Sequence, residues 1–307
     1  MKHISVLKKE AVESLNLKEN SIVVDATLGF GGHSSSILEK IKKGHLYAFD
    51  RDSEAISYSS EFLKNYGTNF TIIKSNFKNM KEELNKLGVS KVDAVLFDLG
   101  VSSVQLDEAE RGFSYQKDAR LDMRMDENQM LDAYYIVNNY TEDELIRIFR
   151  KYGESKYSKS IARKIVSERK KRPIETTLEL AEIIKDSVPE HERRKHHPAR
   201  QIFQAIRIEV NDELGSLKKG LNDSLDLLNI GGRVAVISFQ SLEDKIVKGT
   251  FKEKTFIPER LRGLPNVNPS DMPDFKLASK KIKPSEEEIE SNYRSHSAIL
   301  RVIERVK

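Results

Sequence analysis

The glycine-rich segment Gly29-Phe30-Gly31-Gly32-His33 constrains this chain most, because it closely follows a short apolar, β-branched run at residues 21–25. A buried run that stops at such a turn is typical of a parallel strand. We expect Ser34 to cap a helix that reaches Lys43, and a second strand at residues 46–49. These elements predict a βαβ unit.

The same alternation continues for two further strands. It predicts helices near residues 53–64 and 80–87 and strands at residues 70–73 and 92–97, the last of which runs into Asp98. Four strands that alternate with helices favour an α/β fold with a doubly wound parallel sheet, because the crossover helices cover its faces.

About a hundred residues without this alternation follow, and they read as helices with polar joints. Thr141-x-x-Glu144 and Thr176-x-x-Glu179 both fit the capping-box signature of a helix start. We expect these residues to form an all-helical insertion at residues 107–202. The sheet domain is then discontinuous, with residues 1–106 and 203–307.

The second part of the sheet domain begins with a long helical pattern at residues 203–229. Gly231-Gly232 predicts a turn, and residues 233–239 a buried strand. Apolar and charged residues alternate at residues 298–306, which is typical of an edge strand with one wet face. Four prolines at residues 258–273 indicate a surface loop.

The chain contains no cysteine among its 307 residues. This excludes disulfides, thiolate metal sites, iron–sulfur clusters and a catalytic thiol. The start lacks the apolar core of a signal peptide, and no run approaches the roughly 18 apolar residues that a membrane span needs. We therefore expect a cytoplasmic protein without a membrane partner.

Three acids end predicted strands: Asp25, Asp50 and Asp98. Because the carboxyl ends of parallel strands line one crevice, these carboxylates can converge beside the glycine turn. Asp50 stands twenty-one residues after Gly29, where a dinucleotide fold has its ribose-binding acid. Phe77, just after the third strand, is a candidate to pack on an adenine ring.

Two cofactor classes compete for this turn. The dinucleotide fingerprint needs a third glycine where this chain has Ser34, and an acid, Asp25, precedes the turn, so a nicotinamide oxidoreductase fits poorly. S-adenosylmethionine carries no pyrophosphate, and its site needs acceptors for ribose hydroxyls and amino groups instead of an anion cradle. The turn therefore favours S-adenosylmethionine.

Ordered motifs of one family recur along nearly the whole chain. They include Asp25-Ala26-Thr27-Leu28-Gly29-Phe30-Gly31-Gly32-His33-Ser34, Asp50-Arg51-Asp52, Asp98-Leu99-Gly100-Val101-Ser102-Ser103, Leu121-Asp122-Met123-Arg124-Met125-Asp126, His197-Pro198-Ala199 and Ser238-Phe239-Gln240-Ser241-Leu242-Glu243-Asp244. In these motifs the sequence resembles the RsmH (MraW) family, the small-subunit ribosomal RNA cytosine-N4 methyltransferases. It departs at Gln240, where the family more often has His, and at Gln201, where it more often has Arg.

The resemblance implies a Rossmann-like class I methyltransferase sheet with an inserted helical domain. It implies S-adenosylmethionine contacts from Gly31, Gly32, His33, Asp50, Phe77, Asp98 and Gln105, to which Asp25 and Gly29 are possible additions. The implied substrate is 16S rRNA of the small ribosomal subunit, with cytidine 1402 of the decoding centre as the methylated nucleotide.

The chemistry of a cytosine amine makes positioning the main demand, because the nitrogen lone pair is delocalised into the ring. Asp98, Ser102 and Ser103 follow the fourth strand and supply candidate acceptors for the amine N–H groups. The amine becomes acidic after transfer, so no strong general base is needed. Without cysteine, methylation at the ring carbon and radical cluster chemistry are excluded.

Basic residues concentrate in the insertion. Ten Lys or Arg lie between Arg150 and Arg172 against two glutamates, and a second cluster holds Arg193, Arg194 and Arg200. Lys170, Lys171 and the second cluster are candidate phosphate contacts, although a solvated helix face is an equally good reading of either cluster.

Other residues of the insertion are also candidates for substrate contact. Asp122 and Arg124 either touch substrate or form a buried ion pair. Phe113, Tyr115 and Tyr157 can stack on a splayed base or belong to the core. We expect no metal, because adjacent His196 and His197 side chains diverge and no carboxylate follows at ligand spacing.

Two rival functions remain beside the methyltransferase. One is the nicotinamide oxidoreductase, and the other is a non-catalytic RNA-binding assembly factor that keeps the methyltransferase fold. The sequence leaves open whether the protein forms a homodimer.

Overall fold

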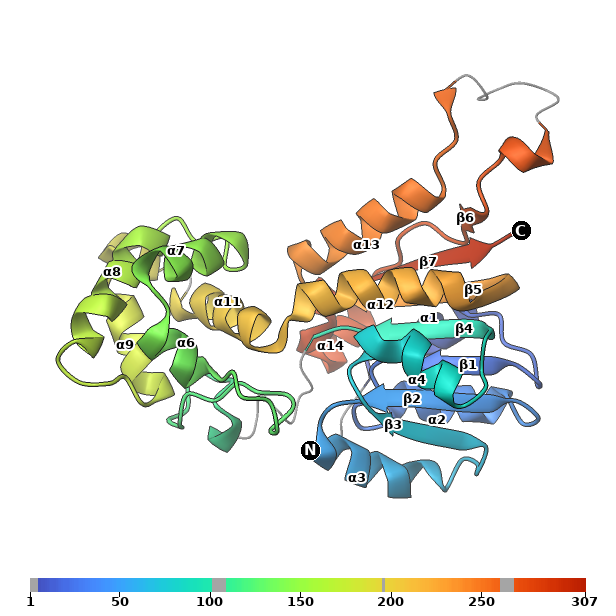
Figure 1. Cartoon of the computed structure of the whole chain (residues 1–307), viewed down its shortest axis with the longest axis horizontal. Helices are drawn as coiled ribbons and strands as arrows, with labels where there is room; N and C mark the ends of the chain where they lie inside the picture. The colour runs from blue at the N-terminus through green and yellow to red at the C-terminus, as the bar shows by residue number, and fades with distance from the viewer. Residues whose placement is uncertain (1–4, 101–108, 195–196, 260–267) are drawn as a thin grey trace. The chain divides into compact units, whose positions relative to one another are not determined.

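The computed structural model describes residues 5–100, 109–194, 197–259 and 268–307 (Figure 1). The chain divides into two compact units, Met1–Gly100 with Leu214–Lys307, and Val101–Glu213. The boundary expected at residue 203 is wrong, because it falls inside helix α11 (Ala199–Asn211). Ile202, Phe203 and Ile206 of this helix are buried in the core of the helical unit.

The first unit is built on a seven-stranded sheet. Its order is β3-β2-β1-β4-β5-β7-β6, in which β1 to β5 are parallel and β7 is antiparallel to both neighbours. The strands are β1 (Ile22–Asp25), β2 (His45–Asp50), β3 (Phe70–Lys74), β4 (Val92–Asp98), β5 (Leu228–Ser238), β6 (Phe275–Leu277) and β7 (Ile299–Arg305). This confirms the predicted Rossmann-like α/β sheet of class I methyltransferases.

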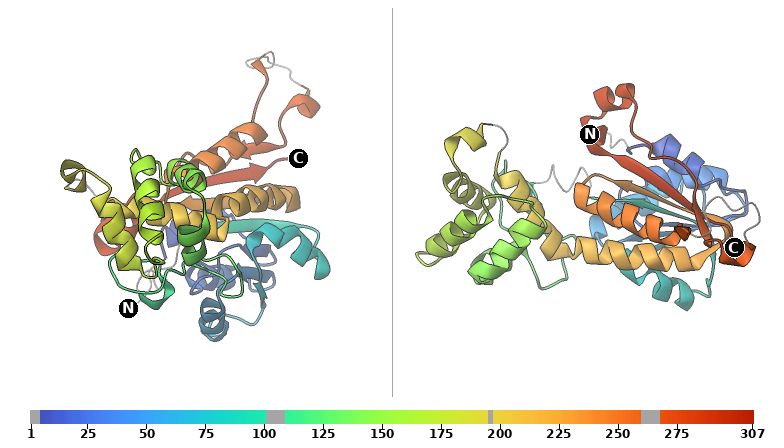
Figure 2. Two further views of the ribbon diagram at one scale, coloured as in Figure 1. Left: turned by 60° about the vertical axis from the view of Figure 1, so that its left-hand side comes forward. Right: turned by 90° about the horizontal axis from the view of Figure 1, so that it is seen from above.

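Helices cover both faces of this sheet because consecutive strand residues point to opposite sides (Figure 2). Val23 packs with α1 (Lys8–Ser14), α2 (Gly32–Lys40) and α3 (Ser53–Leu63), whereas Val24 packs with α4 (Met80–Lys86), α12 (Glu213–Leu227) and α13 (Ser241–Lys254). The short helix α14 (Glu286–Ser291) and the turns η1 (Phe77–Asn79), η4 (Pro269–Asp271) and η5 (Tyr293–Ser297) complete the unit.

Two predictions about helix ends are wrong. The N-cap of α2 is Gly31, in the left-handed region at φ 79°, while Ser34 lies inside the first turn. The helix expected at residues 203–229 is two helices, because Asp212 between α11 and α12 takes a left-handed conformation at φ 47°.

Two predictions about strands also need correction. Gly231-Gly232 is a bulge inside β5, since Val92 pairs with Leu228 while Ala94 pairs with Arg233. The terminal strand β7 is not an edge strand, because the unpredicted β6 pairs with it. Its Arg301 is not on a wet face either, because its guanidinium pairs with Asp244 on α13 at 2.7 and 3.0 Å.

The second unit is helical in the part that the structure describes. It comprises η2 (Ala109–Arg111), α6 (Ala133–Asn139), α7 (Glu142–Lys151), α8 (Ser158–Arg169), α9 (Thr177–Asp186), α10 (Glu190–Arg193) and α11. The capping box at Thr141 is confirmed, with the Glu144 carboxylate on the backbone N–H of Thr141 at 2.8 Å. At Thr176 only the side-chain half forms, because Glu179 accepts from the N–H of Glu175 instead.

Candidate functional site

The turn after β1 is tied together by Asp25, which is 1% exposed. One carboxylate oxygen accepts the hydroxyl proton of Ser34 at 2.6 Å, and the other accepts the backbone N–H of Thr27 at 3.1 Å. Burial raises the pKa of Asp25 to about 6, and the nearby charge of Asp50 adds to the rise, while these two hydrogen bonds oppose it. At Ser34, the position of the third glycine in the dinucleotide fingerprint, this chain therefore has a hydroxyl that donates a hydrogen bond to Asp25.

Asp50 connects the end of β2 to the same turn. Its Oδ2 accepts the backbone N–H of Gly29 at 2.8 Å, and its Oδ1 accepts the N–H groups of Arg51 and Asp52 at 2.7 and 2.9 Å. Burial raises the pKa of Asp50, and the three hydrogen bonds counteract the rise. The Asp50 carboxylate, at the end of β2, thus fixes the backbone of the glycine turn.

Asp98 ends β4 and has the most perturbed carboxyl group of the three. Its backbone N–H donates to Thr27 Oγ1 at 2.7 Å, which links it to the turn. Its Oδ1 is buried and has no hydrogen-bond partner among the described residues. Burial raises the pKa of Asp98 well above its ordinary value, and the charges of Asp25 and Glu243 raise it further. A buried acceptor without a partner is costly unless a ligand fills it.

The glycines of the turn occupy positions where a side chain would be strained or would clash. Gly29 and Gly31 have positive φ values of 49° and 79°, which favour glycine. A Cβ at Gly32 would overlap the hydroxyl of Ser5. His33 is buried, with Nε2 at 3.0 Å from the carbonyl oxygen of Val6 and Nδ1 at 3.4 Å from Asp98 Oδ2.

Phe77 lies in the turn η1 after β3. Its ring meets Phe97 edge to face at a centroid distance of 5.4 Å, and it packs so closely on Gly220 of α12 that a Cβ there would approach the ring to 2.7 Å. Gln105, Ser102 and Ser103 lie outside the described residues. The three acids, the turn glycines and His33 therefore form the described part of the candidate site.

A family model for the MraW methylase family matches residues 1–306 of the chain. The chain belongs to the MraW methylase family. Ribosomal RNA small subunit methyltransferase H of Exiguobacterium sibiricum is 52% identical over 307 residues, covering 99% of this chain and 98% of that protein. The protein of the same name from Limosilactobacillus fermentum is 51% identical over 312 residues, with the same coverage.

Solved structures are also similar to this MraW-family chain. An rRNA methylase from Streptococcus thermophilus is 14% identical with a TM-score of 0.44, covering 98% of this chain and 94% of that one. A methyltransferase from Streptococcus mutans, crystallised with SAH, is 14% identical with a TM-score of 0.46 and full coverage of both chains.

Sequence reasoning missed several residues around the candidate site. Thr27 links two strand ends through its hydroxyl, and Glu243 is 3% exposed at the start of α13, where its Oε2 accepts the backbone N–H groups of Phe239 and Gln240. Ser34 was expected to cap a helix and holds Asp25 instead. No local sequence pattern predicts these roles, because each depends on contacts that form only in the folded sheet.

In the helical unit, Asp122 and Arg124 form a two-point ion pair. Arg124 Nε and Nη2 donate to the two Asp122 oxygens at 2.8 and 2.7 Å, and Nη1 donates to the carbonyl oxygens of Glu127 and Gln129. Although burial raises it, the hydrogen bonds and charge of Arg124 hold the pKa of Asp122 below its ordinary value. These contacts fix the loop, and a substrate contact from this pair stays a prediction.

The basic candidates lie on the surface of the helical unit with different partners. Lys170 and Arg200 are exposed, whereas Lys171 pairs with Glu168 at 2.9 Å and Arg194 with Glu190 at 2.7 Å. Arg193 donates to the carbonyl oxygen of Val188 at 2.6 Å. Arg169, one of the ten basic residues of the first cluster, is committed to the fold, because its guanidinium donates to the carbonyl oxygens of Val137 and Tyr140.

The aromatic candidates of the helical unit mostly serve its core. Phe113 is 5% exposed and Tyr157 is half-buried against the same core. Tyr115 is stacked on His197 at a centroid distance of 4.9 Å and meets Phe203 edge to face.

No cluster of three metal-ligating side chains occurs within the described ranges. None of the described helices is long and apolar enough to span a membrane.

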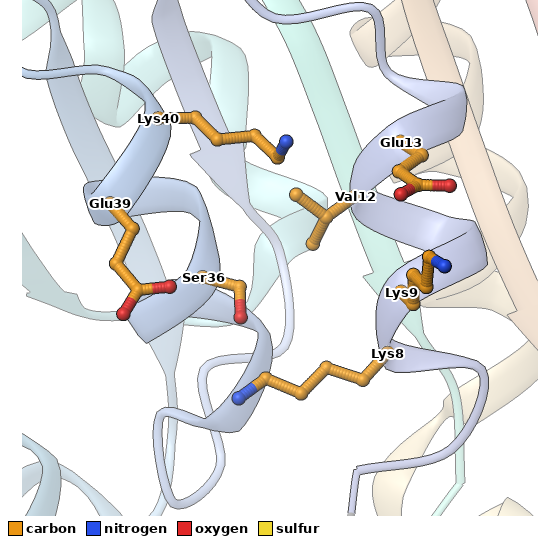
Figure 3. Close-up of a pocket in the computed structure, with 7 residues that line it drawn as sticks. All are labelled: Lys8, Lys9, Val12, Glu13, Ser36, Glu39 and Lys40. Carbon is orange, nitrogen blue, oxygen red and sulfur yellow. The ribbon is translucent and has the colours of Figure 1, made fainter.

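A hollow of about 420 Å³ lies between α1 and the second half of α2 (Figure 3). Lysines and glutamates line it: Lys8, Lys9, Glu13, Glu39 and Lys40, with Val12 and Ser36. None of the strand-end acids lines this hollow, whose lining carries charges of both signs.

Proposed function

We propose that this protein transfers the methyl group of S-adenosylmethionine to the exocyclic N4 amine of a cytidine in 16S rRNA of the small ribosomal subunit, and that the nucleotide is cytidine 1402. The single observation that carries the cofactor assignment is the convergence of three carboxylates at adjacent strand ends, Asp25, Asp50 and Asp98, of which Asp25 is 1% exposed and Asp98 has a buried Oδ1. The substrate assignment is supported by the names of the two relatives and by the motif resemblance.

The acids fit S-adenosylmethionine because this cofactor presents a sulfonium, an ammonium and ribose hydroxyls. Each is a cation or a hydrogen-bond donor, and each is favoured next to a buried acceptor. The partnerless Oδ1 of Asp98 and the remaining acceptor site of Asp50 Oδ2 would hold such groups. Gly31 and Gly32 let the turn pack closely against Phe62, Leu63 and Ser5, which fixes the backbone beside the strand-end acids.

The same geometry disfavours a nicotinamide dinucleotide. A pyrophosphate needs free N–H donors and positive potential at the turn. Here the N–H of Gly29 is committed to Asp50, and buried acids surround the turn, so a pyrophosphate would meet repulsion.

Bound S-adenosylmethionine supplies an electrophilic methyl group, and this chain's task is to orient the amine toward it. We assign that positioning to acceptors at the end of β4, namely Asp98 together with Ser102 and Ser103, the serines by resemblance and sequence position alone. Gln240 has no part in proton transfer in this proposal. It caps α13, where its backbone N–H donates to Glu243.

We assign RNA binding to the basic surface of the helical unit. Arg150, Lys156, Lys159 and Lys170 are exposed and have no ion-pair partner among the described residues, so their charges are available to phosphates. Contacts of this kind position RNA without reading its sequence, which leaves selection of the target to the base-binding site.

The test uses purified protein, labelled S-adenosylmethionine and small subunits that lack the modification. After digestion, label should appear in N4-methylcytidine, and Asp98→Ala should abolish it. Label in another nucleoside would contradict the amine assignment. Cofactor-independent rRNA binding with no transfer would instead support the RNA-binding assembly factor.

A further inference from the structure

Residues 5–7 form a buried strap over the glycine turn of the first unit. Ser5, Val6 and Leu7 are 8%, 7% and 0% exposed, although they lie near the N-terminus. The Ser5 hydroxyl occupies the space beside Gly32 that a side chain there would need, and the Val6 carbonyl faces His33. The strap thus contacts two of the candidate cofactor residues.

Glu288 of α14 anchors this strap from 281 positions away in the sequence. Its Oε1 accepts the backbone N–H of Leu7 at 2.7 Å, while its own N–H donates to Ser285 at 3.2 Å. Leu7 holds a left-handed conformation at φ 50°, which is unfavourable for a branched residue, so the surroundings must stabilise it. The hydrogen bond to Glu288 is one such contact, beside the Ala11 N–H that donates to the Leu7 carbonyl oxygen at 2.8 Å and the burial of the Leu7 side chain.

The strap also determines where the protons of His33 lie. A carbonyl oxygen only accepts hydrogen bonds, so Nε2 of His33, at 3.0 Å from Val6 O, must carry a proton. In a neutral ring Nδ1 is then an acceptor, yet it lies 3.4 Å from Asp98 Oδ2, also an acceptor when ionised. The two atoms attract each other only if one proton lies between them, on Nδ1 or on the carboxyl group.

The groups packed around this pair favour keeping that proton. Asp25 on β1 and Glu243 on α13 both raise the pKa of Asp98 in addition to burial, and Asp50 on β2 faces Asp25. Among the described residues, the charges that act on the pKa of Asp98 are those of Asp25 and Glu243, and both raise it. A proton on the pair removes one negative charge from a cluster of four acids.

We propose that the strap, anchored by Glu288, is a positioning device that fixes His33 as the Nε2–H form, so that His33 and Asp98 share one proton at the cofactor turn. Glu288 is then a positioning residue that acts through Leu7 and Val6. The effect on cofactor affinity rests on the proposed function, whereas the position of the protons does not.

The experiment records ¹⁵N–¹H correlation spectra of histidine-labelled full-length protein, with His33→Asn to assign the His33 signals. The wild type should show a protonated Nε2. Glu288→Ala should broaden or shift the His33 signals and weaken binding of S-adenosylhomocysteine roughly 3- to 10-fold by calorimetry, less than the loss of a direct ligand bond to a charged group because Glu288 acts through Leu7 and Val6. Glu288→Gln keeps an acceptor oxygen and should restore both, while Glu287→Ala on the exposed side of α14 should change neither.

The outcomes separate this proposal from the proposed function. A wild-type His33 with its only proton on Nδ1 overturns the proposal, and so does a folded Glu288→Ala protein with unchanged spectrum and affinity. If Glu288→Ala does not fold, the wild-type spectrum and Glu288→Gln still decide. A protonated Nε2 in a protein that binds no cofactor would leave the proton assignment standing and refute the proposed function.

Discussion

Replacing Asp50 by Asn tests the cofactor site with the least disturbance of the fold. A carboxylate offers four acceptor positions, and three of them hold the backbone N–H groups of Gly29, Arg51 and Asp52. One position on Oδ2 is left for a ligand hydroxyl. Asn keeps the Oδ1 acceptor for two N–H groups, but its amide NH₂ takes the place of Oδ2, so the Gly29 N–H is the one backbone donor that loses its acceptor.

The size of the effect follows from this count. A hydrogen bond to a charged group contributes about 1.5–3 kcal/mol, so losing the ligand bond should weaken S-adenosylmethionine binding about 10- to 150-fold. Asp50→Ala is less informative, because it strands three backbone donors at about 1–3 kcal/mol each, a large part of a total stability of about 5–15 kcal/mol.

Calorimetric titration with S-adenosylmethionine, with circular dichroism as the check on folding, measures the change. Asp52→Asn is the matched control, since it neutralises a buried acid two residues away and keeps the acceptor that caps α3. Equal losses in both variants would point to a general charge effect. Unchanged affinity in a folded Asp50→Asn protein would falsify the assignment.

Three further outcomes are expected. Because the pKa of Asp25 is raised to about 6 in the folded state, its contribution is present below pH 3.8 and should be lost as pH rises through 6, costing the ligand-free protein about 3 kcal/mol of unfolding free energy. Lys170→Glu should weaken rRNA binding and lower its salt slope by about 1–2. Gly44→Ala should destabilise by about 1–3 kcal/mol, because its Cβ overlaps the backbone carbonyl of Ser21, whereas Gly249→Ala in α13 meets nothing within 4 Å and should stabilise by about 1 kcal/mol.

Each outcome has its own control. Urea titrations across pH 4–8 give the unfolding free energy of Asp25→Asn, which should lack the pH dependence that Asp25 contributes. If the difference in unfolding free energy between the variant and the wild type does not change with pH, the burial argument is contradicted. Lys42→Glu reverses the charge of an exposed residue on the first unit and should leave the salt slope of rRNA binding unchanged. Thermal unfolding that ranks Gly44→Ala above Gly249→Ala in stability would contradict the steric argument.

The parallel half of the sheet was predictable because its signals are local. Each strand contains a short apolar run, three of these strands end at an acid, and helical patterns separate the runs. The three strand-end acids could be placed at one edge for the same reason. The antiparallel end was harder: β6 has only three residues, and Leu277 is 56% exposed, so no periodicity identifies it.

What could not be predicted depends on contacts between distant segments. The left-handed conformation of Asp212 divides one helical pattern into two helices, and a pattern of apolar residues does not report φ. The role of Ser34 depends on a carboxylate nine positions earlier, and the anchoring of Leu7 depends on Glu288 near the other end of the chain. Such pairs are visible only once the sheet brings them together.

The three strand-end acids connect the stability of the protein to its choice of ligand. In the free protein, Asp25, Asp50 and Asp98 all have raised pKa values, so ionising them at neutral pH works against the folded state. A cationic ligand lowers the free-energy cost of ionising these acids, because it favours the charged form of each. An anionic pyrophosphate raises that cost. The raised pKa values of these acids therefore favour a sulfonium over a dinucleotide. This preference also explains why an acid before the turn was a better guide to the cofactor than the glycines themselves.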